Sequence, residues 1–316
     1  MKIVLTGSIA YDYLMSFPGR FRDHILADRL DRLSLSFLVD SLIRRRGGIA
    51  ANIAYTMALL GERPLVMATA GEDFEEYRAW LDRHGVDTSA IRVIPGLLTA
   101  SFFVNTDQVN AQIASFYTGA MARAGELRFR DLTAPPDLAV ISPNDPGAMQ
   151  AYVDECRELG IPYIYDPSQQ TVRLEPEALL AGIAYGRALF CNDYEFGLIS
   201  EKTGLGLDAM VGQVDFLVIT RGDHGADVYQ AGQTLHIPAV PPIKMADPTG
   251  VGDAFRGGFL KGYAHNLSLE QCGQMGALAA TYCLEEEGTQ GHHFTLAEFL
   301  HRFRLTFDGG DELERL

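Results

Sequence analysis

A segment near the C-terminus carries residue types that could activate an alcohol beside an anion. It reads Asp247-Pro-Thr-Gly-Val-Gly-Asp253 and continues into an apolar stretch of helical period. Gly250 and Gly252 leave backbone N–H groups open at a helix N-terminus, whose partial positive charge attracts anions. Asp253 falls in the first turn, where its carboxylate can accept the proton of a hydroxyl that attacks phosphorus. A plain capped helix is the alternative, but two aspartates that bracket Thr-Gly-x-Gly favour the chemical interpretation.

The elements that must hold Asp253 alternate between short apolar strands and stretches of helical period. Strands are expected at residues 2–6, 65–69, 138–142, 162–165, 188–191 and 216–220, and helices at 48–60, 74–84, 250–264 and 269–284. This alternation predicts an α/β fold in which a central, mostly parallel sheet is flanked by helices on both faces. In such folds ligands bind at the carboxyl ends of the strands.

Two segments interrupt the alternation. Residues 12–46 lack a clear helix, and residues 98–117 read as a hairpin with a polar turn at 107–110. Strand-like pieces inside an α/β chain indicate a small β-sheet lid, contributed by about residues 12–46 and 97–119. We expect one domain over residues 1–316, in which the lid either caps a monomer or forms a homodimer contact.

Composition excludes several classes of protein. The chain of 316 residues has 41 acidic and 26 basic side chains, a formal charge of −15, which argues against a nucleic-acid partner. No apolar run approaches the ~18 residues of a membrane span, and the N-terminus lacks a signal-peptide pattern. The four cysteines are widely separated and include no Cys-x-x-Cys. We therefore expect a cytoplasmic protein with no membrane association.

Four motifs, in order along the chain, carry a family resemblance. They are Gly47-Gly48-Ile-Ala-Ala-Asn52, Asn192-Asp-Tyr-Glu195, Thr220-Arg-Gly222-Asp-His-Gly225 and the Asp247–Asp253 segment. Together they resemble the ribokinase-like, or phosphofructokinase-B, family of sugar and nucleoside kinases over essentially the whole chain. Gly7-Ser8-Ile-Ala-Tyr-Asp12, Ser36-Phe-Leu, the 115–121 stretch and the ending Asp-Ala-Phe-Arg are most similar to adenosine kinase-type nucleoside kinases of bacteria and archaea.

The resemblance implies roles for individual residues. Asp253 would be the catalytic base, and the amides of Gly250, Val251 and Gly252 would form the anion hole; Pro248, which replaces a threonine, has no N–H to contribute. Asp12 would bind the ribose hydroxyls with Gly48 and Asn52 beside it, and Ser8 and Ser36 belong to the same expected substrate site. Taken alone, Asp12 fits a turn aspartate better than a ligand, and Asn52 fits a first-turn helix residue equally well.

The resemblance also implies a nucleotide site. Asn192 and Glu195, one helical turn apart, would place Mg²⁺ near the phosphates, although their spacing also satisfies a capping box. Thr220, Gly222 and Gly225 would let the backbone approach ATP, while Arg221 reaches either a phosphate or solvent.

Stacking on aromatic side chains is the expected way to hold a base. Phe102 and Phe116, one on each arm of the hairpin, are the candidates, with Gln112, Gln169 and Gln170 offering amides; the two rings could equally be the core of the lid. The Arg44-Arg45-Arg46 run is expected at a solvated lid edge rather than in a phosphate clamp, and Lys261 on a solvated helix face.

These observations predict transfer of the γ-phosphoryl of ATP, with Mg²⁺, to the 5′-hydroxyl of a purine nucleoside, adenosine first. A sugar kinase of the same family, for ribose, fructose or a keto-deoxy sugar, is the first alternative. A non-catalytic nucleoside-binding regulator is the second.

Overall fold

The larger of two sheets forms the centre of the molecule. In the computed structural model, which describes residues 1–25, 34–307 and 313, this sheet has nine strands. In spatial order they are β13 (Gln233–Ile237), β12 (Ala226–Gln230), β11 (Phe216–Thr220), β10 (Ala188–Asn192), β9 (Tyr163–Tyr165), β8 (Leu138–Ile141), β1 (Ile3–Thr6), β4 (Leu65–Ala70) and β5 (Ile91–Val93). All pairs from β11 to β5 are parallel, and β12 is antiparallel to both neighbours. The predicted α/β architecture is confirmed.

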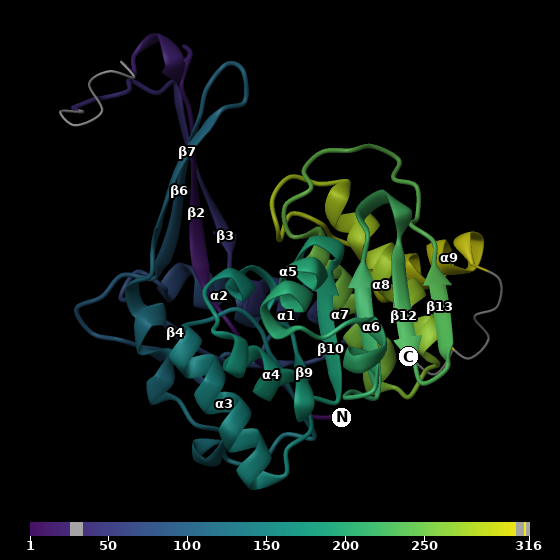
Figure 1. Cartoon of the computed structure of the whole chain (residues 1–316). Coiled ribbons are helices and arrows are strands. Elements are labelled where there is room, and N and C mark those ends of the chain that lie inside the picture. Colours follow the sequence, from purple (N-terminus) through teal and green to yellow (C-terminus); the bar gives the residue numbers. More distant parts are fainter. Residues whose placement is uncertain (26–33, 308–312, 314–316) are drawn as a thin grey trace.

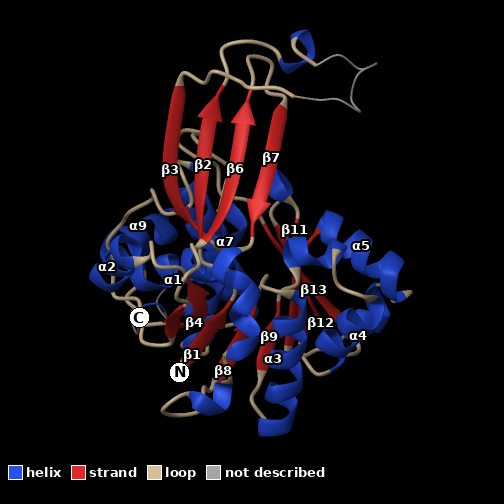
Figure 2. Ribbon diagram, turned by 90° about the vertical axis from the view of Figure 1, so that its left-hand side faces the viewer, coloured by secondary structure: helices blue, strands red, loops and turns tan. Residues whose placement is uncertain are grey.

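Helices cover both faces of this sheet (Figure 2). One buried apolar cluster joins one face to α1 (Ile49–Leu59), α2 (Glu75–Arg83), α7 (Val251–Ala264), α8 (Leu269–Leu284) and α9 (Leu296–Thr306). A second cluster joins the other face to α3 (Pro146–Leu159), α4 (Pro176–Ala184), α5 (Asp193–Thr203) and α6 (Leu207–Val211). Short 3₁₀ segments are η1 (Phe21–Asp23), η3 (Gly119–Glu126), η4 (Phe129–Asp131), η5 (Ser168–Val172) and η6 (Gly222–His224).

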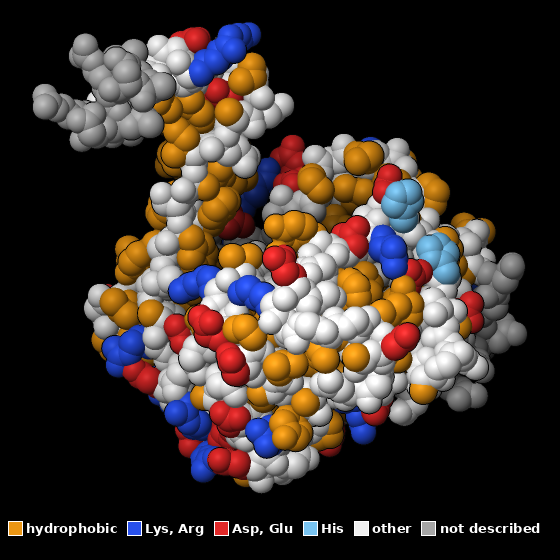
Figure 3. Space-filling model, in the orientation of Figure 1, with side chains coloured by type: hydrophobic (Ala, Val, Ile, Leu, Met, Phe, Trp, Pro, Cys, Tyr) orange, Lys and Arg blue, Asp and Glu red, His pale blue; other side chains and the backbone are white. Residues whose placement is uncertain are grey.

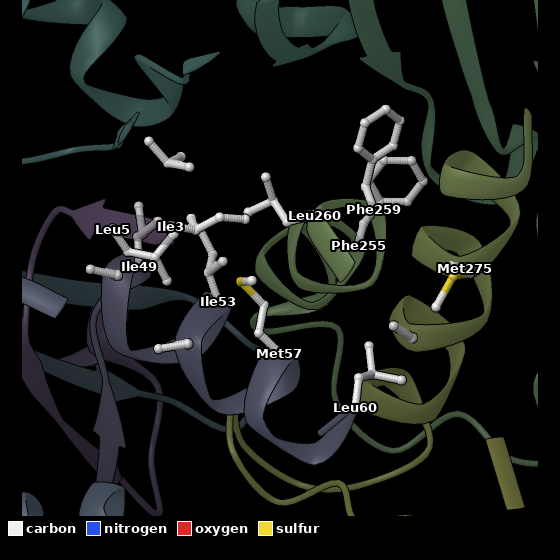
Figure 4. Close-up of a cluster of buried hydrophobic side chains, with 14 of the residues drawn as sticks. Ile3, Leu5, Ile49, Ile53, Met57, Leu60, Phe255, Phe259, Leu260 and Met275 are labelled. Carbon is white, nitrogen blue, oxygen red and sulfur yellow. The ribbon is translucent and has the colours of Figure 1, made fainter. Parts of the chain in front are cut away.

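Helix α7 is packed between α1 and α8. Ile53 and Met57 of α1 lie on one side of α7, whereas Phe255 and Phe259 project from α7 away from α1 (Figure 4). Phe259 packs against Phe190 and Phe216 of the sheet, and Met275 of α8 belongs to the same apolar cluster. Gly258 permits the close approach to α8, since a Cβ there would lie 2.5 Å from the Met275 carbonyl oxygen. The start of α7 is therefore held rigidly at the carboxyl edge of the sheet.

This burial corrects the expectation for Lys261. Its side chain is buried, and its Nζ lies 2.8 Å from the Glu62 carboxylate, which also pairs with His265. Because α7 is buried almost all round from Ala254 onward, its sequence has no polar face that would place a lysine in solvent.

The second sheet stands away from the body (Figure 1). Its strands are, in order, β3 (Ser41–Gly47), β2 (Ala10–Ser16), β6 (Ala100–Thr106) and β7 (Gln112–Tyr117). The hairpin predicted for residues 98–117 is present as β6 and β7, and β2 joins the large sheet to the small one directly after β1. We call this second sheet the lid.

The cysteines and the helices can also be compared with what the sequence predicts. All four cysteines are buried and free, as the packing interpretation predicted for Cys272 and Cys283. Among the helices of the described residues, none combines the length and apolar character needed to cross a bilayer.

Candidate active site

A polar pocket lies where the carboxyl ends of the central strands meet the start of α7 and the base of the lid. Its volume is about 540 Å³, and the surface is visibly hollowed beside the lid (Figure 3). Most of the predicted site residues line it: Ser8, Asp12, Gly48, Asn52, Phe102, Gln112, Phe116, Gln169, Asn192, Glu195, Thr220, Gly250, Gly252 and Asp253. They come from segments more than 200 residues apart in the chain.

Asp253 lies in the first turn of α7, directly on the pocket. Gly250 precedes the helix as its N-cap in the left-handed conformation, with φ of 82°. Within the described part of the chain the N–H groups of Gly250 and Gly252 have no hydrogen-bond acceptor, so both remain available as donors at this end of the helix. Val251 is half-buried and outside the pocket lining, and its N–H donates to the Pro248 carbonyl at 3.4 Å.

The Asp253 carboxylate is both desolvated and held in place. Asn52 Nδ2 donates to its Oδ2 at 2.8 Å. Burial raises the pKa of Asp253 to about 6, although Arg256 and the Asn52 hydrogen bond both act to lower it. A carboxyl whose pKa lies near neutral pH is well suited to general-base work.

Arg256 provides the buried positive charge beside this carboxylate. Its Nη2 lies 2.6 Å from Asp166 Oδ1, and its Nη1 donates to the Gly252 carbonyl at 3.0 Å. Ser142 Oγ donates to the second Asp166 oxygen at 3.1 Å. This pair ties the end of β9 to the first turn of α7.

The base of the lid meets α1 at Gly48, the N-cap of α1. Its φ is 95°, and a Cβ there would lie 2.6 Å from the Ala10 nitrogen and the Ser8 carbonyl oxygen. Ser8 Oγ in turn accepts a hydrogen bond from the Ile49 N–H at 3.1 Å. Only glycine allows β1, β2 and α1 to converge here, and this convergence brings Asn52 to Asp253.

Asp12 projects into the pocket from β2, directly opposite Arg45 of β3. The pKa of Asp12 is raised to about 6, mainly by burial and also by the Asp247 carboxylate, while Arg45 acts to lower it. A carboxylate at this depth has the acceptor geometry for two neighbouring hydroxyl groups of a ligand.

Arg45 corrects the expectation for the arginine run. Arg44 and Arg46 bind Glu76 at 2.5 and 2.7 Å on one side of β3, whereas Arg45 turns to the pocket and pairs with Glu287 at 2.6 Å. Successive side chains of a β-strand point to opposite faces of the sheet. Of the three arginines, only Arg45 therefore faces the pocket.

Two aromatic rings of the lid stand over the pocket as a cross-strand pair. Phe102 of β6 is directly opposite Phe116 of β7, and both rings line the pocket with Gln112. Gln170, in contrast, is buried and donates to the Asn144 carbonyl, so Gln169 alone of that pair reaches the pocket. Ser36 is exposed and lies outside the pocket lining.

Asn192 and Glu195 form the capping box of α5 and also line the pocket. Asn192 Oδ1 accepts from the Glu195 N–H at 2.7 Å, and Glu195 Oε2 accepts from the Asn192 N–H at 2.8 Å. Burial raises the pKa of Glu195, and Ser168 donates to its Oε1 at 3.1 Å. Each oxygen of the Glu195 carboxylate accepts one of these hydrogen bonds and keeps a free lone pair. The Glu195 carboxylate can therefore still act as one ligand of a hard cation.

This donor set fits Mg²⁺ that keeps most of its water. Among the described residues no group of three or more His, Cys, Asp or Glu side chains could hold a metal ion. A dedicated metal cage is therefore not built here, whereas Mg²⁺ bound mainly to phosphates needs only one or two carboxylates.

The predicted nucleotide loop reaches the pocket only at its first residue. Thr220 lines the pocket at the end of β11. Arg221 turns away and pairs with Asp227 at 2.7 Å and with the Tyr229 hydroxyl at 2.9 Å. Gly222 and Gly225 both have positive φ and close a tight turn, but they lie outside the pocket lining.

Sequence reasoning missed several residues of the site. They are Arg45, Ser168, Asp247, Thr249, Arg256, Gly288 and Thr289 as parts of the pocket lining, with Gln290 behind them. Asp247 and Arg256 stand inside the recognised motif, where their side chains were assigned no role. Nothing in the sequence pattern marks residues 288–290, which reach the site through the turn after α8.

Comparison with known proteins is consistent with this geometry. The model of the pfkB family of carbohydrate kinases matches residues 14–294. The chain belongs to the pfkB family. This membership confirms the family resemblance drawn from the four motifs.

Two solved structures and two curated proteins are similar to this pfkB chain. Burkholderia thailandensis nucleoside kinase in complex with inosine superposes with a TM-score of 0.87 at 36% identity, covering 98% of this chain and 99% of that one. The same enzyme with ADP and inosine gives 0.85 over 98% and 97% of the two chains, also at 36% identity. A nucleoside kinase of Methanocaldococcus jannaschii is 28% identical over 92% of each chain. A cytidine kinase of Thermococcus kodakarensis is 27% identical, covering 77% of this chain and 88% of its own.

Proposed function

We propose that this protein transfers the γ-phosphoryl of ATP to the 5′-hydroxyl of a purine nucleoside, with adenosine as the first candidate. The observation that carries the proposal is Asp253, bound by Asn52 and placed beside the open amides of α7 in a pocket roofed by two phenylalanines. The similarity to proteins named nucleoside kinase, one of them bound to inosine, supports a nucleoside as the acceptor.

In this proposal each group acts at one place. Asp12 binds the two ribose hydroxyls, and Phe102 and Phe116 stack on the base. Asp253 accepts the proton of the 5′-hydroxyl as that oxygen attacks the γ-phosphorus and ADP leaves, while the amides of Gly250 and Gly252 bind the transferring phosphoryl oxygens. Asn192 and Glu195 would hold Mg²⁺ with the ATP phosphates, and the ion, when bound, neutralises their charge. Closing the lid would exclude water as a competing acceptor.

A panel of acceptors tests the proposal. In a coupled assay for ADP release with MgATP, adenosine, inosine, guanosine and cytidine are compared with ribose and fructose. We expect turnover of the purine nucleosides and none of 5′-deoxyadenosine, which binds like adenosine but lacks the acceptor hydroxyl. Turnover of ribose or fructose without any nucleoside would establish the sugar-kinase alternative, and preference for cytidine would remove the purine assignment.

We propose further that two copies pair through the face of the lid that points away from the pocket. Tyr13 and Phe103 stack there with ring centroids 4.7 Å apart, and Leu42 and Ile113 are 61% and 44% exposed beside them. An apolar patch of this kind is typical of an association surface.

Phe103→Lys should convert a dimer to a monomer in sedimentation velocity, because it places a charge in the middle of this face. Val109→Lys, at the tip of the hairpin where the side chain is 53% exposed, should leave the dimer intact. A monomeric wild-type protein at tens of micromolar would contradict this proposal and leave the kinase proposal untouched.

A further inference from the structure

A chain of side-chain hydrogen bonds runs from the proposed catalytic base to the indole of Trp80. Asn52 Nδ2 donates to Asp253 at 2.8 Å, and Gln290 Nε2 donates to Asn52 Oδ1 at 2.9 Å. Trp80 Nε1 then donates to Gln290 Oε1 at 3.1 Å. Asn52 and Gln290 are buried, and the four residues come from α1, α2, α7 and the turn after α8.

The chemistry of the indole sets the direction of this chain. An indole N–H can only donate, so the Gln290 oxygen must face Trp80 and its NH₂ must face Asn52. The Asn52 oxygen is then the acceptor, and its NH₂ is directed at Asp253. Reversing either amide would bring two acceptors or two donors together in a buried site, which is costly.

A second contact holds the same amide nitrogen of Gln290. Tyr77 donates its hydroxyl proton to the Gly47 carbonyl at 2.9 Å, so its oxygen accepts from Gln290 Nε2. Gly47 is the last residue of β3, which connects this arrangement to the base of the lid. The guanidinium of Arg46 lies 4.3 Å from the centre of the Trp80 ring and covers it.

We propose that Trp80 and Gln290 are positioning residues for phosphoryl transfer, because they orient the Asn52 amide so that it donates to the base. The inference rests on the proposed function only in assigning Asp253 as that base. We call the hydrogen-bonded series Trp80, Gln290 and Asn52 the relay. Without the relay the Asn52 amide is free to rotate, and the Asp253 carboxylate loses the donor that favours its ionised form and fixes its orientation. Arg256 is the charged group that acts on Asp253 from its own helix. The charged or ionisable groups that act on it from other elements are Asp166 after β9, Asp12 of the lid and Cys283 of α8.

Two variants separate orientation from structure. Gln290→Met keeps the length of the side chain but cannot donate, and Trp80→Phe keeps a smaller aromatic ring and removes the N–H. We expect kcat to fall by roughly fivefold or more in Gln290→Met, with KM for both substrates within about twofold. We expect the acid limb of kcat/KM to move to higher pH by up to about one unit. The matched control is Tyr55→Phe, which removes a buried hydroxyl bound to the His292 carbonyl and packs on the same indole; its acid limb should not move.

A double-mutant cycle gives the decisive measurement. Since both residues act through one chain, Trp80→Phe should have little further effect on kcat in the Gln290→Met background. Additive losses, or a Gln290→Met enzyme with wild-type kcat and pH profile, would overturn the relay.

Failure of the proposed function would look different. A wild-type enzyme that phosphorylates no nucleoside removes that function. The ionisation of Asp253 is then still measurable by ¹³C-carboxyl NMR, assigned with Asp253→Asn, and an unchanged titration in Gln290→Met would overturn the relay without any assay of activity.

Discussion

Asp253→Asn is expected to lower kcat for the nucleoside by at least ~10²-fold, the usual contribution of a general base. The asparagine side chain has the shape of the carboxylate, so its oxygen can still accept from Asn52. It cannot take a proton from the attacking hydroxyl. The acceptor nucleoside should therefore bind with a Kd within about threefold of wild type, as measured by calorimetry.

The stability of this variant provides the control. The pKa of Asp253 is raised to about 6 in the folded protein from 3.8, so the native state binds a proton more tightly than the unfolded chain between these values. The carboxyl therefore contributes a stability that is present at low pH and lost as pH rises through 6. At pH 7 the ionised form opposes folding, and Asp253→Asn should have a Tm equal to or above that of wild type.

This combination of results distinguishes the two classes of function. Loss of turnover with retained binding and retained stability identifies a group needed for chemistry alone. A non-catalytic nucleoside-binding protein would show no turnover in either form. An active Asp253→Asn enzyme would remove the base assignment.

The parts of the site predictable from sequence are those where one local segment fixes the geometry. The left-handed N-cap at Gly250 and the first-turn position of Asp253 follow from seven consecutive residues. The Asn192 and Glu195 capping box follows from four. The sequence predicts Phe102 and Phe116 on the two arms of one hairpin, and the register of that hairpin in the structure places them directly opposite each other.

The parts that could not be predicted depend on contacts between distant segments. Arg45 faces the pocket because β3 pairs with β2 in one register, with Asp12 opposite, and three successive arginines give no signal of that register. Gln290 lies 238 positions from its partner Asn52. Lys261 is buried because α1, α8 and the sheet surround α7. The absence of a polar face on α7 is compatible with this burial, but its carboxylate partner Glu62 lies 199 positions away in the chain.

The ion pair between Arg256 and Asp166 illustrates the same limit, since 90 residues separate its partners. Its position explains why an arginine follows the helix start so closely. It joins the loop after β9 to the Gly252 carbonyl and places a positive charge where the phosphoryl group and Asp253 are expected to meet. Arg256 is thus expected to serve both the stability of the α7 start and the charge of the phosphoryl site.

Arg256→Met is accordingly expected to lower the free energy of unfolding by about 3–5 kcal/mol, the cost of leaving one member of a buried ion pair alone. Asp166 is fully buried and, among the residues that the structure describes, would keep only Ser142 as a side-chain partner. Urea denaturation at pH 7 measures the loss, with an unchanged m-value as evidence that the fold is retained.

Asp166→Asn in the Arg256→Met background supplies the control, because it removes the stranded charge and keeps the hydrogen-bonding shape. The double variant should be more stable than Arg256→Met alone, so that the two effects are strongly non-additive. Arg256→Met should also lower kinase activity, because the positive charge beside Asp253 and the phosphoryl site is lost. The double variant should not recover that activity, since the charge is still missing. If Arg256→Met costs less than about 1 kcal/mol, the pair does not hold α7 to the sheet, and the rigidity attributed to the start of that helix must come from apolar packing alone.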